Sequence, residues 1–162
     1  MKHLHTFEPF DWSDVDLTEI KYEKVTTKLI ESLHPKIQTI VNKMLTFKPE
    51  YNYNNCLLDV KVRLLSKGQC GCPLEEFHYD WVKDYDELPS THETHFIYSN
   101  INGTQFQHYK CKDNSIYTYN RELHKGTIQY DDVKRVLIRL SYTDNKKNKS
   151  KLHENKVILE TL

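Results

Sequence analysis

The sequence has no excess charge of either sign and no long apolar run. Its 23 basic and 23 acidic residues balance, so no overall field attracts nucleic acid or an anionic membrane. No apolar run is long enough to span a bilayer, and Met1 to His5 are not followed by the apolar core of a signal peptide. We therefore expect a cytoplasmic protein that does not bind membranes, and its charge does not indicate nucleic-acid binding.

Cysteine is also scarce, and the four residues Cys56, Cys70, Cys72 and Cys111 are too scattered for a disulfide framework. Only Cys70 and Cys72 lie close together. With His78 or Cys111 they offer a zinc site, but the second cysteine pair that usually marks such a site is missing. The simpler interpretation is a turn that contains two buried thiols.

Glycine occurs four times against eleven tyrosines and six phenylalanines, a composition that favours sheet. A chain of 162 residues suits one domain with one core. We expect a single domain over 1–162: an arm and covering helices in 1–50, a β core in 56–144, and a basic loop with a possible edge strand in 145–162.

Two helices are predicted before the strands. Residues 1–16 are expected to form an irregular arm attached to the body by its aromatic side chains. From Asp16 to Leu33 the apolar spacing becomes helical. A second predicted helix runs from Pro35 to about Phe47, with an apolar stripe suited to covering a sheet. Alternatively, that stripe docks on a partner protein.

After Cys56 the period changes from helical to extended. Short strands are predicted at 57–65, 92–100, 104–109, 115–120 and 134–142. In the second of these, we expect His95 to lie on the surface. Several short strands after two helices predict a mainly β protein with amino-terminal helices, closed as a barrel or jelly roll.

His78 and Asp80 stand two residues apart near the edge of a further predicted strand, so an extended backbone points both to one side. His124, far along the chain, supplies a third ligand. Two imidazoles and one carboxylate form a face that leaves coordination positions open, as in non-haem Fe(II) oxygenases. The sequence thus carries a candidate iron site at His78, Asp80 and His124.

The order of these residues resembles that of the 2-oxoglutarate and Fe(II)-dependent dioxygenases, in the prolyl-hydroxylase and phytanoyl-hydroxylase region of that superfamily. Arg135 follows the distal histidine by eleven residues and matches the arginine that binds the far carboxylate of 2-oxoglutarate. The resemblance implies a double-stranded β-helix (jelly roll) covered by helices, and it assigns Tyr98 to the same carboxylate. Arg139 shares the strand face of Arg135 and is the alternative for that contact, with Ser141 beside it.

The resemblance implies hydroxylation of a substrate with conversion of 2-oxoglutarate to succinate and carbon dioxide, with no catalytic residues beyond the metal ligands. Tyr79, Trp81 and Arg63 are candidates for lining the substrate entrance. The substrate itself, whether a protein side chain, a nucleobase or a small metabolite, and the oligomeric state are not indicated. Two alternatives stay open: a jelly-roll module that binds or inhibits without turnover, and a cupin-like metal protein that does not use 2-oxoglutarate.

Overall fold

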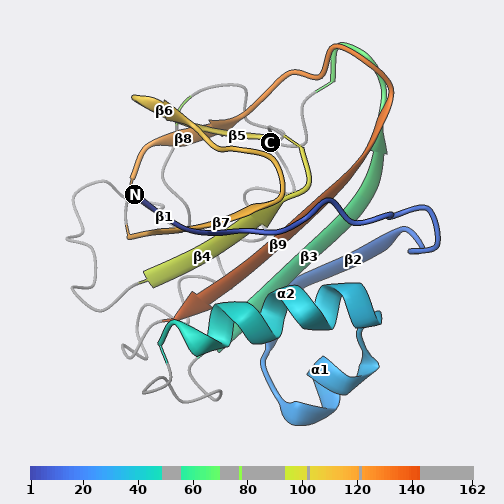
Figure 1. Ribbon diagram of the computed structural model, residues 1–162, viewed down its shortest axis with the longest axis vertical. Coiled ribbons are helices and arrows are strands. Elements are labelled where there is room, and N and C mark those ends of the chain that lie inside the picture. Colours follow the sequence, from blue (N-terminus) through green and yellow to red (C-terminus); the bar gives the residue numbers. More distant parts are fainter. Residues whose placement is uncertain (49–55, 70–76, 78–93, 102, 121, 143–162) are drawn as a thin grey trace.

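The computed structural model describes residues 1–48, 56–69, 77, 94–101, 103–120 and 122–142 (Figure 1). In these residues the chain forms two antiparallel sheets and two helices. The larger sheet has six strands in the order β1 (Lys2–Thr6), β7 (Ser115–Tyr119), β4 (Thr94–Ser99), β9 (Val133–Tyr142), β3 (Cys56–Leu65) and β2 (Thr18–Lys24). The smaller sheet has the order β6 (Tyr109–Lys110), β5 (Thr104–Phe106) and β8 (His124–Gly126). The prediction of a mainly β protein with amino-terminal helices is confirmed.

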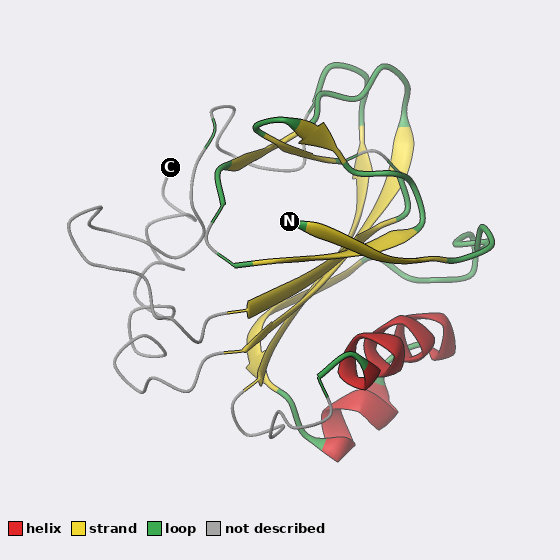
Figure 2. Cartoon of the chain, turned by 60° about the vertical axis from the view of Figure 1, so that its left-hand side comes forward, coloured by secondary structure: helices red, strands yellow, loops and turns green. Residues whose placement is uncertain are grey.

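The helices α1 (Thr27–Ser32) and α2 (Pro35–Thr46) lie on one side of the larger sheet, and the smaller sheet lies on the other (Figure 2). The second helix begins where the sequence predicts. Pro35 occupies its first turn, where the missing N–H costs little, and His34 Nδ1 accepts a hydrogen bond from the Lys36 amide at 3.2 Å. Buried Ile37, Ile40, Val41 and Met44 form the predicted apolar stripe, and it covers the sheet.

The centre of the larger sheet is the pair β3 and β9. The two strands pair without interruption from Cys56 with Tyr142 to Leu65 with Val133. Both read as nearly continuous apolar runs interrupted by charged residues, a pattern typical of strands covered on both faces. Their charged side chains therefore have no solvent face on which to lie in the middle of the sheet.

Each face of the larger sheet has its own apolar core. On the helix side, strand residues such as Val60, Tyr98 and Ile138 pack with the stripe of α2. Between the sheets, a smaller core contains Ile97, Phe106, Cys111, Tyr117, Tyr119 and Leu137. Successive residues of a strand point to opposite faces, so one strand serves both cores.

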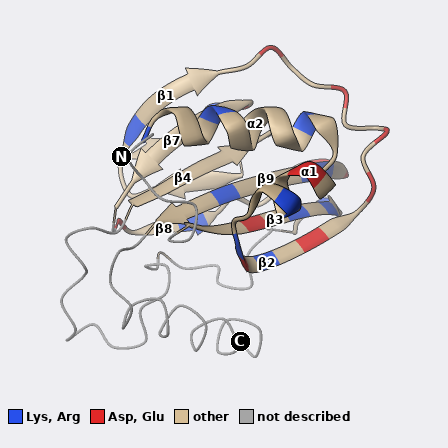
Figure 3. Ribbon diagram, turned by 90° about the horizontal axis from the view of Figure 1, so that it is seen from below, with Lys and Arg blue, Asp and Glu red and all other residues tan. Residues whose placement is uncertain are grey.

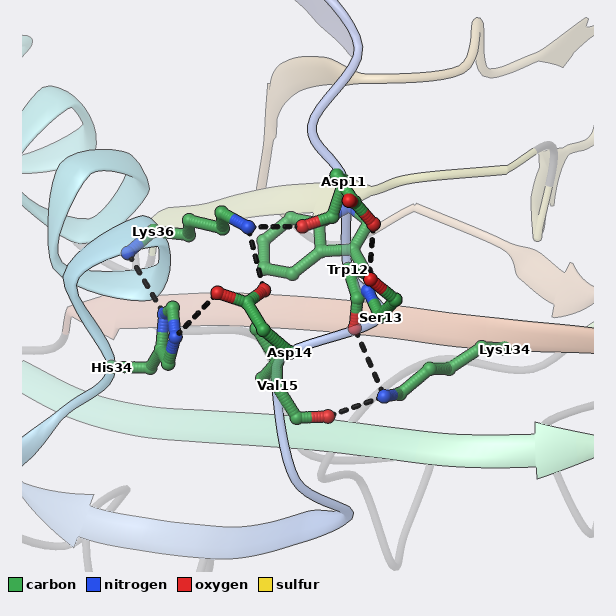
Figure 4. Close-up of polar contacts among 8 residues, drawn as sticks. All are labelled: Asp11, Trp12, Ser13, Asp14, Val15, His34, Lys36 and Lys134. Carbon is green, nitrogen blue, oxygen red and sulfur yellow. Dashed lines mark hydrogen bonds and ion pairs between the residues drawn. The ribbon is translucent and has the colours of Figure 1, made fainter.

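The structure corrects the expected irregular arm over residues 1–16, because Lys2–Thr6 form the edge strand β1 and pair with β7. After β1, the expected aromatic anchoring is confirmed. Phe7 packs edge-on against Tyr98 with ring centroids 5.9 Å apart, and Trp12 is buried. Figure 4 shows the arm also held by polar contacts: Lys134 Nζ donates to the carbonyl of Trp12 at 2.9 Å, and Lys36 Nζ pairs with Asp14 at 2.6 Å.

The helix expected to begin at Asp16 is also corrected. Residues Thr18–Lys24 form the strand β2, and only Thr27–Ser32 are helical. The reason is tertiary, because the edge of β3 offers a full ladder of hydrogen-bonding groups to this segment. Thr26 then caps the short helix by accepting from the Leu29 amide at 3.0 Å.

No helix within the described part of the chain is long and apolar enough to cross a membrane. The side chains of Cys56 and Cys111 are buried. Cys70, Cys72 and the basic segment 145–162 lie outside the described residues.

Candidate functional site

A group of polar side chains lies on the face of the larger sheet that looks toward the smaller sheet. The register places them in rows across the sheet. The first row is Leu57, Ser141, His95 and Tyr119; the second is Asp59, Arg139, Ile97 and Tyr117. Buried polar groups at such positions carry a cost unless they have partners, so their contacts identify the candidate site.

The first row connects the larger sheet to β8 of the smaller one. His95 is fully buried, and its Nδ1 lies 2.9 Å from Ser141 Oγ. Its ring stacks on Tyr119 with centroids 4.8 Å apart, and Tyr119 meets the ring of His124 at 5.5 Å. A hydroxyl and two imidazoles thus lie at one end of the space between the sheets.

The second row contains a buried ion pair. Arg139 Nη2 lies 3.2 Å from Asp59 Oδ2, and Arg139 Nε lies 3.4 Å from the same oxygen. Figure 3 shows β9 and β3 as neighbouring strands that both carry charged positions, and the register places Asp59 opposite Arg139. The Asp59 side chain is 2% exposed, so water screens the pair little.

His124 is held in one tautomer. Its Nδ1 lies 2.9 Å from the carbonyl oxygen of Glu122. A carbonyl oxygen only accepts hydrogen bonds, so Nδ1 carries the proton and Nε2 of the neutral ring carries the lone pair. Histidine ligands in metal sites are usually fixed in this way by a carbonyl or carboxylate.

Apolar and aromatic side chains complete this space. Phe106 of β5 packs against His124 with centroids 5.6 Å apart, and Ile97 and Leu137 flank Arg139 on the same face. Burial raises the pKa of Tyr117, whose hydroxyl also accepts from the Lys112 amide at 2.8 Å. Burial likewise raises the pKa of the Cys111 thiol to about 12. These surroundings favour neutral groups and strengthen any charge pairing near them.

Arg135 lies on the predicted face, at the opposite end of β9 from Ser141. It stands six residues before Ser141 on β9, which corresponds to about 20 Å along the strand. Its Nη2 donates to the Gly103 carbonyl at 2.9 Å. Arg63 lies opposite Arg135 in the register and pairs with Glu19 at 2.6 Å, so this entrance candidate also lies at the far end.

The structure corrects the expected position of Tyr98. It lies opposite Ile138, whose side chain points to the helix side, whereas Arg135 and Arg139 point between the sheets. Its hydroxyl donates to Asn114 Oδ1 at 3.0 Å, and burial raises its pKa. Tyr98 is therefore a core residue and cannot share a ligand with either arginine. Arg139 and Ser141 lie on one strand face, as predicted.

The other predicted site residues, His78, Tyr79, Asp80 and Trp81, lie outside the described residues. Their neighbour Phe77 is described, and Lys125 Nζ lies 4.8 Å from the centre of its ring. The described residues contain no group of three or more His, Cys, Asp or Glu side chains able to hold a metal.

Two members of the site were not predicted. His95 was expected on the surface, but it is 0% exposed, and Asp59, which is 1% exposed, was not among the predicted site residues. The missed signal is the apolar content of β3 and β9, which indicates cover on both faces and therefore burial of any charged residue within them. A buried acidic residue and a buried arginine then have to be partners.

A scan of protein-family models and searches of curated proteins and of solved structures found no match to this chain.

Proposed function

We propose that this chain is an Fe(II)- and 2-oxoglutarate-dependent oxygenase with a double-stranded β-helix, which hydroxylates a substrate and releases succinate and carbon dioxide. His78, Asp80 and His124 are proposed to hold the iron. Arg139 with Ser141 is proposed to bind the far carboxylate of 2-oxoglutarate. The observation that carries the proposal is a chain of contacts from His124 through Tyr119 and His95 to Ser141, with Arg139 two residues before Ser141 on the same face of β9.

Strand pairing supports the fold. Disregarding the edge strands β1 and β2, the pairs are nested: the first strand, β3, with the last, β9; then β4 with β7; and innermost β5 with β6. The pairs of β4 with β9 and of β5 with β8 roll this ribbon into two sheets. A jelly roll is an eight-stranded double sheet of this kind. Its remaining strand would fall between β3 and β4 in sequence, where the strand with His78 and Asp80 is predicted.

The donor set fits a ferrous ion. His124 presents Nε2 as the lone-pair nitrogen, and neutral imidazole together with a carboxylate suits Fe(II). The contact between Phe77 and Lys125 supports the partnership, because each residue directly precedes or follows a proposed ligand in the chain.

Distance favours Arg139 over Arg135 as the carboxylate partner. Arg139 is one row from Ser141, or about 7 Å along β9, whereas Arg135 is three rows away at about 20 Å. The five-carbon chain of 2-oxoglutarate spans only about 5 to 6 Å between its end carbons, because it contains four bonds of about 1.5 Å. A keto acid with one end at Ser141 therefore reaches the row of Arg139 and not that of Arg135.

The chain's own groups have definite tasks in this scheme. The Arg139 guanidinium offers planar paired donors to a carboxylate, and the Ser141 hydroxyl adds a neutral donor. Ile97, Leu137 and Phe106 exclude water, which strengthens that contact. Bound iron would supply the activation of oxygen, while the protein supplies binding, orientation and a dry site. Tyr79 and Trp81 remain predictions for the substrate entrance.

One observation favours a second candidate, a jelly-roll module that binds without turnover. The positive charge of Arg139 is already balanced by Asp59, so the fold does not require an anionic ligand at this point. A module of this kind would keep the polar rows for stability and specificity of packing.

The discriminating experiment is anaerobic addition of Fe(II) and 2-oxoglutarate, followed by oxygen. We expect the weak visible charge-transfer band of an iron chelate, then succinate. His124→Ala should abolish both, as should His78→Ala or Asp80→Ala. The matched control is His108→Ala, since His108 is an exposed histidine and its loss should leave both signals unchanged. A folded wild-type protein that gives neither the band nor succinate would favour the non-catalytic module.

A further inference from the structure

We infer that Asp59 is a specificity-determining residue of this site, which competes with the far carboxylate of a 2-oxo acid for Arg139. The inference rests on the proposed function. It states that the site prefers a dicarboxylate to the matching monocarboxylate only weakly, and that removal of the Asp59 charge makes the preference strong.

Asp59 is fixed from two sides. Its Oδ2 faces Nη2 and Nε of Arg139 at 3.2 and 3.4 Å, and its Oδ1 accepts from the Tyr22 amide at 3.1 Å. Tyr22 lies at the register break of β2 between Ile20 and Glu23, with a φ of 47°. A tyrosine rarely adopts this left-handed conformation, so the surrounding structure must hold it there. The bulge therefore aims a backbone donor at Asp59.

The pair also determines what Arg139 offers to a ligand. The Nε and Nη2 edge of a guanidinium can bind a carboxylate through two parallel hydrogen bonds, and Asp59 already faces this edge. A ligand carboxylate beside the pair would put two negative charges against one positive charge in a poorly screened space. Its binding is therefore weaker than binding to an arginine without a fixed counter-ion.

The neighbours of Arg139 suit an uncharged ligand end. Ile97 and Leu137 lie beside it in the register, and both belong to the apolar core between the sheets. An aliphatic tail would bury surface there without a charge penalty. The chemical class that this site accepts is therefore a short 2-oxo acid, with or without a second carboxylate.

The test compares 2-oxoglutarate with 2-oxopentanoate, which has the same number of carbons and no second carboxylate. Binding of each to the Fe(II)-loaded chain is measured anaerobically by calorimetry. In the wild type we expect a preference for 2-oxoglutarate below about tenfold, which corresponds to about 1.4 kcal/mol. In Asp59→Asn we expect 2-oxoglutarate to bind about tenfold tighter or better, with 2-oxopentanoate changed by less than about twofold.

Glu19→Gln is the matched control, because Glu19 forms a carboxylate–arginine pair with Arg63 at the exposed far end. It should change neither affinity. If Asp59→Asn is only marginally stable, 2-oxoglutarate should raise its melting temperature more than an equal concentration of 2-oxopentanoate does, since its far carboxylate replaces the lost counter-ion.

A wild-type preference above about a hundredfold, or an unchanged ratio in folded Asp59→Asn, would overturn the inference while leaving the oxygenase proposal intact. Failure of the wild type to bind either oxo acid in the presence of Fe(II) would instead contradict the proposed function. The two failures are therefore distinguishable.

Discussion

The two faces of the six-stranded sheet are made by the same strands and differ in chemistry. The helix side is continuous apolar packing around residues such as Ile40 and Ile138. The side toward the small sheet alternates apolar residues with buried charges, hydroxyls and imidazoles. Polar groups at this depth weaken a core unless they are satisfied. We conclude that the helix side supplies stability, and that the inner face gives up some of it to accommodate buried polar groups.

The largest effect should come from breaking the buried ion pair. Arg139→Ala leaves the Asp59 carboxylate buried without this partner, so we expect a loss of about 3 to 5 kcal/mol in the free energy of unfolding. Urea denaturation measures the loss. Replacing both residues, Asp59→Leu with Arg139→Met, should restore most of the stability while abolishing dicarboxylate binding. If Arg139→Ala were as stable as wild type, this would contradict the proposed importance of the Asp59–Arg139 ion pair.

The helix side should respond differently. Ile40→Ala removes a fully buried side chain of α2, and we expect a loss of about 2 to 4 kcal/mol from lost burial and the cavity left behind. Affinity for the oxo acid should be unchanged at temperatures where the variant is folded. A large change in affinity with little change in stability would remove the distinction between the two faces.

A smaller effect is expected at Gly103, whose lack of a side chain admits Arg135. A Cβ there would lie 2.5 Å from Arg135 Nε, so in Gly103→Ala the guanidinium must move away from the Gly103 carbonyl. We expect a loss of about 1 to 2 kcal/mol for the broken hydrogen bond and the crowding. Oxo-acid affinity should stay within about twofold, and a tenfold loss would instead assign the carboxylate to Arg135.

The smallest effect concerns Cys111 in the core between the sheets. Its pKa is raised by burial from 9.0 to about 12, so the unfolded thiol ionises first as pH rises. The contribution of the protonated Cys111 thiol to the free energy of unfolding is fully present below pH 9, decreases above it and is lost near pH 12. The free energy of unfolding is measured for both proteins at pH 7 and at about pH 10. Between these two values, it should fall by roughly 1 kcal/mol less in Cys111→Ala than in wild type. Equal losses of stability in wild type and Cys111→Ala would indicate that the Cys111 thiol is exposed to solvent.

Sequence patterns correctly predicted those helices and strands whose local conformational preference agrees with the tertiary contacts they make. Pro35 and the stripe of α2 identify that helix, and the alternation after Cys56 identifies β3. The segment from Asp16 to Leu33 failed because its helical spacing competes with pairing along the edge of β3, a tertiary effect that local spacing does not contain. Residues 2–6 failed for the same reason, since their partner lies far along the chain on β7.

For the site, order along the chain predicted the shared face of Arg139 and Ser141 but not the depth of each arginine. The position of Arg135 depends on how β9 packs against the segment before β5, where its guanidinium meets the Gly103 carbonyl. The position of Tyr98 was predicted wrongly because alternation along one strand separates its two faces but does not say which face turns toward the smaller sheet. The pairing of Asp59 with Arg139 depends on register between two distant strands, which no local pattern specifies.

The most direct test of the central claim is anaerobic calorimetric titration of Fe(II) into wild type and His124→Ala. The account predicts one bound ion per wild-type chain and none in the variant, with far-ultraviolet circular dichroism unchanged. A wild-type chain that binds no ferrous ion, or a folded His124→Ala that binds it equally well, would contradict the claim that the space between the sheets is an iron site.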